Sequence, residues 1–148
     1  MNCNLAGIAL IKKFEGCRLE AYRDGNGTWT CGWGATGPDV AQGLVWTQAQ
    51  ADARLLIDLH EKAEVPLEKL AAYELDPNRF SALCSLIYNI GAGNFEKSAV
   101  LEAVNAGDFE DVPDHMRAWC HDNAGNVVKG LVARREAEIE LWDDPSAP

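Results

Sequence analysis

Residues 14–36 read FEGCRLEAYRDGNGTWTCGWGAT, and the residue types in this stretch predict its local fold. The run Asp24-Gly25-Asn26-Gly27 is a strong turn signal, because Asp, Asn and Gly tolerate the backbone angles that tight turns need. Aromatic and Thr residues separated by glycines follow the turn, as in Trp29 and Thr30, and these residue types favour strands. We therefore expect a small hairpin sheet within residues 17–36.

Helices are predicted on both sides of this stretch. Apolar residues between Leu5 and Phe14 recur at helical spacing, and Gly16 is suited to end that helix because glycine readily adopts the left-handed backbone conformation. On the other side, Thr47-Gln48-Ala49-Gln50 is a capping box, in which the Thr caps the helix and the second Gln reaches back. This box is expected to open a long helix that ends near Ala63.

The most apolar helix is expected in the middle of the chain. Asp76-Pro77 provides an N-cap followed by Pro at the first helical position, apolar residues recur from Phe80 to Ile90, and Gly91 ends the pattern. We predict that this helix is the buried centre of the molecule. Three further helices are predicted: one that Ser98 caps and that closes near Gly107, one that Asp111 opens and that runs to Trp119, and one from Gly130 to Trp142.

The predicted fold class is α+β, with a small sheet lobe beside a larger helical lobe. The hairpin lobe is expected at about residues 15–46, the helical lobe at residues 1–14 and 47–142, and a tail at residues 143–148. A chain of 148 residues is the size of one ordinary domain, so we expect a single domain.

Composition and charge weigh against several classes of protein. With 13 basic and 23 acidic residues the net charge is −10, which disfavours binding to nucleic acid or to anionic membrane surfaces. Five cysteines without a C-x-x-C pair, and three histidines without an H-E-x-x-H array, predict neither a disulfide framework nor a metal site. No apolar run approaches the ~20 residues of a membrane helix, and the first residues lack the order of a signal peptide. We therefore expect no metal, no nucleic acid and no stable membrane association.

Three polar residues around the predicted hairpin suggest chemistry. Glu15 is expected to end the first helix beside Phe14, where the helix dipole and partial burial both favour the protonated form that a general acid requires. Asp24 lies in the polar turn, where backbone N–H groups should keep it ionised, and Thr30 offers a hydroxyl that can hold a water molecule. Hydrolysis of a glycosidic bond uses two carboxyl groups in unlike environments. On residue types alone, solvated turn acids remain the simpler interpretation.

The order of motifs along the chain resembles that of a known family. Phe14 to Asp24 and Thr28 to Thr36 resemble the opening of the phage endolysins of glycoside hydrolase family 24, which are lysozymes that cleave bacterial peptidoglycan. Further similar stretches follow in the family's order: Thr47 to Ala51, Phe80 to Leu83, Tyr88 to Gly93, Asn105 to Phe109, Trp119, and Lys129 to Glu138. The resemblance covers about residues 5–142 and implies a lysozyme-like fold with a substrate cleft between the two lobes.

The resemblance also implies a function and roles for individual residues. The chain is expected to be a muramidase that hydrolyses the bond between N-acetylmuramic acid and N-acetylglucosamine and lyses the host cell. Glu15 matches the family's general acid, and Asp24 and Thr30 match the pair that positions the attacking water, with inversion at the anomeric carbon in related enzymes. Gly34, Tyr88 and Asn89 match residues of the saccharide cleft, with Trp119 as a further candidate for its wall, and either Arg134 or Arg135 is expected to pair with Glu15.

Partners and location follow from the same resemblance. We expect a monomer that uses no cofactor, stays in the host cytoplasm until lysis, and then acts on peptidoglycan in the periplasm with the help of a membrane-permeabilising holin. Two other functions remain open: a lytic transglycosylase acting on the same bond, and a wall-binding module without turnover. Asp24 and Thr30 favour hydrolysis, because a transglycosylase needs one acid/base glutamate and no site for an attacking water.

Two features depart from the family's pattern. Ala35 stands where the family often has His, which concerns local packing more than catalysis. The net charge of −10 differs from the basic character of many endolysins, so long-range attraction to an anionic wall is expected to be weak.

Overall fold

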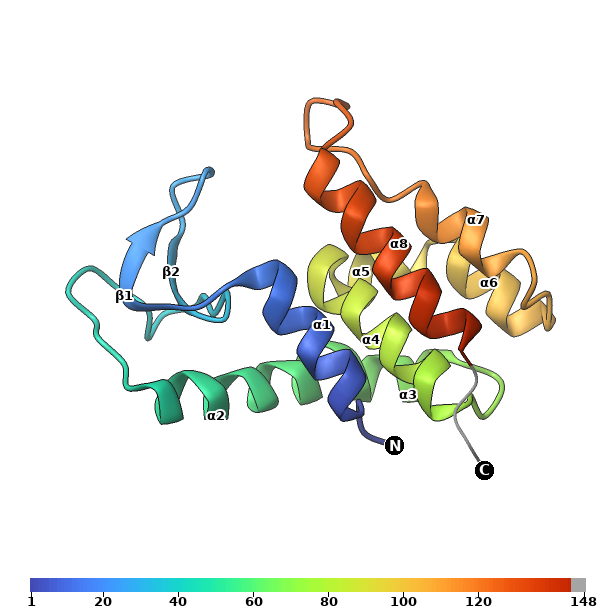
Figure 1. The fold of residues 1–148 in the computed structure, drawn as a ribbon, viewed down its shortest axis with the longest axis horizontal. Coiled ribbons are helices and arrows are strands. Elements are labelled where there is room, and N and C mark those ends of the chain that lie inside the picture. Colours follow the sequence, from blue (N-terminus) through green and yellow to red (C-terminus); the bar gives the residue numbers. More distant parts are fainter. Residues whose placement is uncertain (145–148) are drawn as a thin grey trace.

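A small hairpin stands apart from a larger group of helices in the computed structural model, which describes residues 1–144 (Figure 1). The hairpin consists of β1 (Arg18–Arg23) and β2 (Trp29–Gly32), which run antiparallel with Tyr22 opposite Thr30. The hairpin and the α+β fold class predicted from the sequence are confirmed.

The first helix, α1 (Leu5–Glu15), carries the chain into the hairpin. Asn4 caps it by accepting a hydrogen bond from the Gly7 N–H, and Gly16 ends it with a φ of 67°, in the left-handed region that favours glycine. The chain leaves the helix sharply at this glycine. Glu15, the last residue of α1, therefore lies where the helices meet the hairpin (Figure 1).

A long helical segment runs from beside the hairpin to the helical group (Figure 1). It begins with α2 (Gln48–Leu59), and the predicted capping box is present. The Gln50 N–H donates to Thr47 Oγ1 at 3.2 Å, and the Thr47 N–H donates to Gln50 Oε1 at 2.9 Å. The start of this segment is therefore determined by local hydrogen bonds.

The end predicted for this segment, near Ala63, is wrong. The helix continues through a π-helical turn, η1 (His60–Glu64), into α3 (Val65–Leu70). Leu59, Ala63 and Leu67 lie four residues apart and are all buried. The apolar stripe thus crosses the wider turn, and packing against the core maintains the helix beyond the predicted end.

The central helix, α4 (Pro77–Ile90), is the middle of the core, as predicted. Asp76 caps it by accepting hydrogen bonds from backbone N–H groups of its first turn. All residues from 80 to 87 are buried, and the helix packs against α1 and against α8 (Lys129–Asp143).

The shorter helices between α4 and α8 are α5 (Ala92–Glu96), α6 (Ala99–Ala106) and α7 (Val112–Arg117). The α6 helix begins after Ser98 and ends at Gly107, as predicted. The α5 helix was not predicted, because five residues are too few to show a helical period. The α7 helix follows Asp111 as predicted, but it ends two residues before the predicted Trp119.

The last helix, α8, extends one residue beyond the prediction at each end. Asp143, predicted to start a tail, is therefore helical, and residues 145–148 of that predicted tail lie outside the described residues. Within residues 1–144, no helix has the length and apolar character needed to cross a membrane.

Candidate active site

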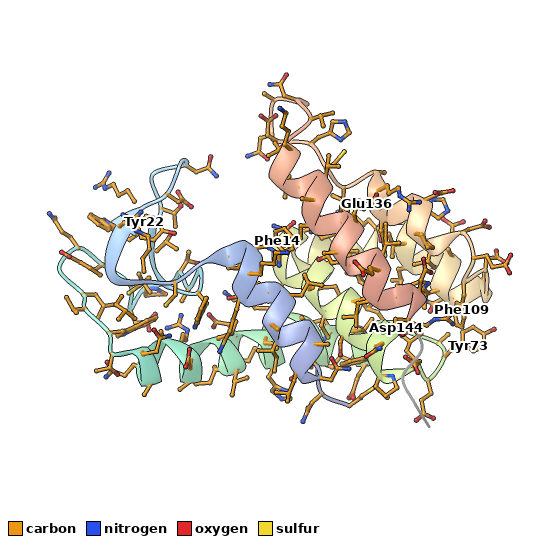
Figure 2. The ribbon with its side chains drawn as sticks, in the orientation of Figure 1. Phe14, Tyr22, Tyr73, Phe109, Glu136 and Asp144 are labelled. Atoms are coloured by element: carbon orange, nitrogen blue, oxygen red, sulfur yellow. The ribbon has the colours of Figure 1, made fainter. Side chains whose placement is uncertain are left out.

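The candidate site is built around Glu15. Its side chain keeps 20% of its surface exposed, and Nη1 of Arg134, on α8, donates a hydrogen bond to Glu15 Oε1 at 2.8 Å. Figure 2 shows the neighbouring Phe14 at the end of α1, between the hairpin that carries Tyr22 and the helix that carries Glu136. Of the two arginines left open by the sequence, Arg134 is the partner of Glu15. A carboxyl group that is partly buried but reachable from solvent can exchange a proton with a ligand.

Gly34 brings a loop against this carboxyl group. Its φ is 90°, and a Cβ at this position would lie 2.7 Å from Glu15 Oε2. The preceding residue is held by two side chains: the Tyr88 hydroxyl donates to the Trp33 carbonyl at 3.0 Å, and Trp33 Nε1 donates to Asp52 Oδ1 at 2.7 Å. The loop is thus fixed with bare backbone beside the Glu15 carboxyl group.

Tyr88 contributes a neutral phenol to this region. Burial and the nearby Glu15 carboxyl group raise the pKa of Tyr88 above its ordinary value. Its hydroxyl is engaged with the Trp33 carbonyl, so its polar contact supports the loop that carries Gly34.

Asp24 and Thr30 lie together on the hairpin. Oδ1 of Asp24 accepts hydrogen bonds from the N–H groups of Asn26 and Thr28, both at 2.9 Å, which are the backbone contacts that the turn sequence predicted. Thr30 is buried, and its hydroxyl donates to the Thr28 carbonyl at 3.0 Å. The hydroxyl oxygen of Thr30 keeps lone pairs with which it can accept a further hydrogen bond.

Asn89 and Trp119 form a second group of candidate residues. Nη2 of Arg135 donates to Asn89 Oδ1 at 2.8 Å, and Nη1 donates to the Trp119 carbonyl at 3.2 Å. Both residues line a pocket of about 230 Å³, whose other lining residues are Ile90, Asn94, His121, Asn123 and Leu131. The predicted substrate-binding residues therefore divide in two: Gly34 and Tyr88 are near Glu15, whereas Asn89 and Trp119 border this pocket.

Two buried polar residues of the region, Glu138 and Ser85, are not among the predicted site residues. Ser85 Oγ donates to Glu138 Oε2 at 2.5 Å, and Glu138 Oε1 lies 2.7 Å from Arg135 Nε. The signal was present in the sequence, because Glu138 follows Arg134 by four residues and Arg135 by three, which places it beside both on a helix. Burial raises the pKa of Glu138, and the two guanidinium groups oppose that rise.

Comparison with known proteins matches residues 12–138 to a family described as phage lysozyme. This chain belongs to the phage lysozyme family. The assignment made from motifs is therefore confirmed. The solved endolysin from Escherichia coli O157:H7 phage FAHEc1 is 32% identical, with a TM-score of 0.90 over 100% of this chain and 97% of that one. The lysozyme-like fold is confirmed with it.

Relatives in this family differ in length. The endolysin of Bacillus phage B103 is 36% identical over 96% of this chain, which spans 54% of that protein. The SAR-endolysin of Enterobacteria phage P21 is 38% identical over 86% of this chain and 78% of its own length. The chain thus spans about half the length of the first of these phage lysozyme relatives.

The fold accommodates Ala35, the residue that the sequence resemblance marked as a departure from the family's pattern. Ala35 is buried, its N–H donates to the Cys31 carbonyl at 2.8 Å, and the Cys31 N–H donates to the Ala35 carbonyl at 2.9 Å. The loop after β2 is therefore held by backbone hydrogen bonds that do not depend on the side chain at position 35.

Replacing Gly34 by Ala is expected to reduce roughly 100-fold the rate of a reaction that uses the Glu15 carboxyl group, because the new methyl group displaces that group from its position. Gly43→Ala is the matched control: Gly43 has a φ of 87°, and nothing lies within 4 Å of a Cβ built there. Both variants carry similar backbone strain, of about 1–2 kcal/mol. Initial rates of turbidity loss and thermal midpoints separate strain from displacement, and equal losses of rate in both variants would contradict the close contact.

Proposed function

We propose that this chain is a muramidase that hydrolyses the bond between N-acetylmuramic acid and N-acetylglucosamine in bacterial peptidoglycan and so lyses the host cell. The observation that carries the proposal is the Glu15 carboxyl group, which is partly exposed and paired with Arg134 at 2.8 Å. A second carboxyl group, Asp24, lies in a different environment on the hairpin turn. Membership of the phage lysozyme family supports the same activity.

Glu15 is the proposed general acid. Its proton passes to the glycosidic oxygen as the bond from that oxygen to the anomeric carbon breaks. The sugar that keeps this oxygen therefore leaves as a neutral alcohol. Glu15 is left as a carboxylate, which the hydrogen bond from Arg134 stabilises.

Asp24 and Thr30 are proposed to position the attacking water. Oδ1 of Asp24 is occupied by two backbone N–H groups, and within residues 1–144 no hydrogen bond to Oδ2 is found. We assign Oδ2 to accept the proton of the water, while the Thr30 hydroxyl orients the water oxygen. The water oxygen bonds to the anomeric carbon from the face opposite the leaving group, and the configuration inverts.

The four predicted cleft residues are proposed to bind the saccharide. Arginine has only donors, so its contact with Asn89 Oδ1 leaves the Asn89 NH₂ group to donate to a carbonyl such as that of an N-acetyl group. Trp119, on the same pocket, offers an aromatic wall. Gly34 and Tyr88 are assigned to the sugar position next to Glu15.

The cellular part of the proposal rests on family membership. We propose that the chain acts on peptidoglycan as a monomer, that it waits in the host cytoplasm, and that it reaches the periplasm through membrane lesions made by a holin. Expression in Escherichia coli with and without a co-expressed holin tests this part. Lysis that needs the holin is expected, and lysis without it would contradict the proposed dependence.

The activity is tested by digesting purified Gram-negative peptidoglycan and identifying the fragments by mass spectrometry. Hydrolysis is expected to release fragments with reducing ends at N-acetylmuramic acid. Anhydro-sugar ends would assign a lytic transglycosylase instead, and binding to the wall without any released fragment would assign a binding module. Proton NMR of fresh products then gives the anomeric configuration, which inversion predicts to be opposite to that of the substrate.

A further inference from the structure

The two arginines that reach the candidate site contact the same buried carboxyl group. Glu138 is 0% exposed, and its two arginine neighbours, Arg134 and Arg135, are 4% and 1% exposed. Nε of Arg134 lies 3.4 Å from Glu138 Oε2, and Nε of Arg135 lies 2.7 Å from Glu138 Oε1. A carboxyl group in this position is the counter-charge of both guanidinium groups.

Each arginine then extends from Glu138 to a different part of the site. Arg134 reaches Glu15 Oε1 at 2.8 Å, and Arg135 reaches Asn89 Oδ1 at 2.8 Å. On the other side Ser85, of α4, donates to Glu138 Oε2 at 2.5 Å, and its carbonyl accepts from Arg134 Nη2 at 3.2 Å. The proposed acid and the proposed sugar-binding amide are therefore linked through one buried residue.

We infer that Glu138 is a positioning residue that holds Arg134 against Glu15 and Arg135 against Asn89, and that it balances their charge beside the general acid. Glu138 has this role only if the chain has the proposed function, because it touches neither substrate nor reacting atoms. Arginine side chains are long and flexible, and a buried charge needs a partner. The Glu138 carboxyl group restricts the movement of both arginine side chains and supplies the opposite charge that each buried guanidinium group needs.

The charge balance gives the inference a pH signature. With Glu138 and Glu15 ionised, two negative groups balance two guanidinium groups. Removing the charge of Glu138 leaves an excess positive charge next to Glu15, which favours the ionised and catalytically incompetent form of that acid. Within residues 1–144, the charged groups beside Glu138 are Arg134 and Arg135, both of α8. Glu15 of α1 and Tyr88 of α4 face Arg134, and Cys120, after α7, faces Arg135.

Glu138→Gln tests the inference with soluble, uncross-linked peptidoglycan strands as substrate. We expect kcat to fall about tenfold, KM to rise, and the alkaline limb of the pH–rate profile to move roughly one pH unit lower. Glu136→Gln is the matched control: it removes the same charge two residues away, from an exposed residue on α8 that pairs with Arg117 at 2.8 Å (Figure 2). The control is expected to keep the wild-type profile.

A double variant that leaves no excess charge distinguishes the proposed role of Glu138 from a general loss of protein stability. Glu138→Gln combined with Arg135→Met removes one charge of each sign, so the alkaline limb of the pH–rate profile is expected to return close to its wild-type pH. KM is expected to stay high, because Arg135 no longer holds Asn89. This double variant also serves if the single variant does not fold, because a buried pair is replaced as a unit. An alkaline limb in Glu138→Gln that coincides with that of the wild type, or one still displaced in the double variant, would overturn the inference.

A readout without turnover distinguishes this inference from the proposed function. Carbon-13 NMR follows the titration of the Glu15 carboxyl carbon, assigned by its loss in Glu15→Gln. Its midpoint is expected at lower pH in Glu138→Gln than in the wild type, whatever the substrate is. A wild type that releases no reducing ends would refute the proposed function, and an unmoved midpoint would refute the role of Glu138.

Discussion

Glu15→Gln is expected to lower the rate of peptidoglycan hydrolysis about 1,000-fold or more, because the amide cannot donate the proton that the leaving oxygen needs. Such a loss corresponds to about 4 kcal/mol of transition-state stabilisation. The amide oxygen can still accept the hydrogen bond that Arg134 Nη1 makes at 2.8 Å, so the fold should be retained. Clearing of chloroform-treated Gram-negative cells, with reducing-end release from purified wall, measures the effect.

Glu20→Gln is the control for this variant. Glu20 lies on β1 and is exposed, so its substitution changes the net charge equally without touching the candidate site. Its rate is expected within twofold of the wild type, in line with the small effects of surface substitutions. Clearing by folded Glu15→Gln at more than a tenth of the wild-type rate would remove Glu15 from the role of general acid.

Asp24→Asn is expected to lower the rate about 100-fold or more, because the amide cannot take the proton of the attacking water. The turn itself should survive, since an amide oxygen can accept the same bonds from Asn26 and Thr28 that Oδ1 accepts at 2.9 Å. The measurement is the initial rate of reducing-end release, with KM determined separately so that a loss of binding is not mistaken for a loss of turnover.

The chain contains a closely matched control for Asp24→Asn. Asp122 closes a turn of the same kind, with its Oδ1 accepting from the N–H groups of Ala124 at 3.0 Å and Asn126 at 2.9 Å. Backbone hydrogen bonds lower the pKa of Asp122. Asp122→Asn therefore removes one charge from an equivalent turn and is expected to leave kcat unchanged. Equal losses in both variants would indicate that turn stability, and not proton transfer, is what Asp24 supplies.

The features that sequence predicted well depend on contacts between near neighbours. The hairpin follows from the turn at Asp24, whose side chain bonds to the backbone two and four residues later. The starts of α2 and α4 follow from Thr47 and Asp76, which cap the backbone of the next turn. These interactions span fewer than five residues, so the residue types within a short window determine them.

The features that sequence missed depend on packing between distant segments. The continuation of α2 into α3 required knowing that Ala63 and Leu67 are buried by the core. Hydrophobic patterning does not show the buried face of α8, because that face carries Arg134, Arg135 and Glu138 beside Ile139 and Trp142. A pattern that assigns charged residues to solvent cannot show a buried cluster of paired charges.

The sequence by itself determined the α+β class, the family, and the identities of Glu15, Asp24 and Thr30 as candidates, because short-range turn and cap signals and the order of motifs carry that information. Only the tertiary structure decided which arginine meets Glu15. Arg134 and Arg135 are adjacent in the sequence, and both are buried on α8. Their side chains diverge by about 100° around the helix axis, so the packing of α8 against α1 and α4 directs one to Glu15 and the other to Asn89.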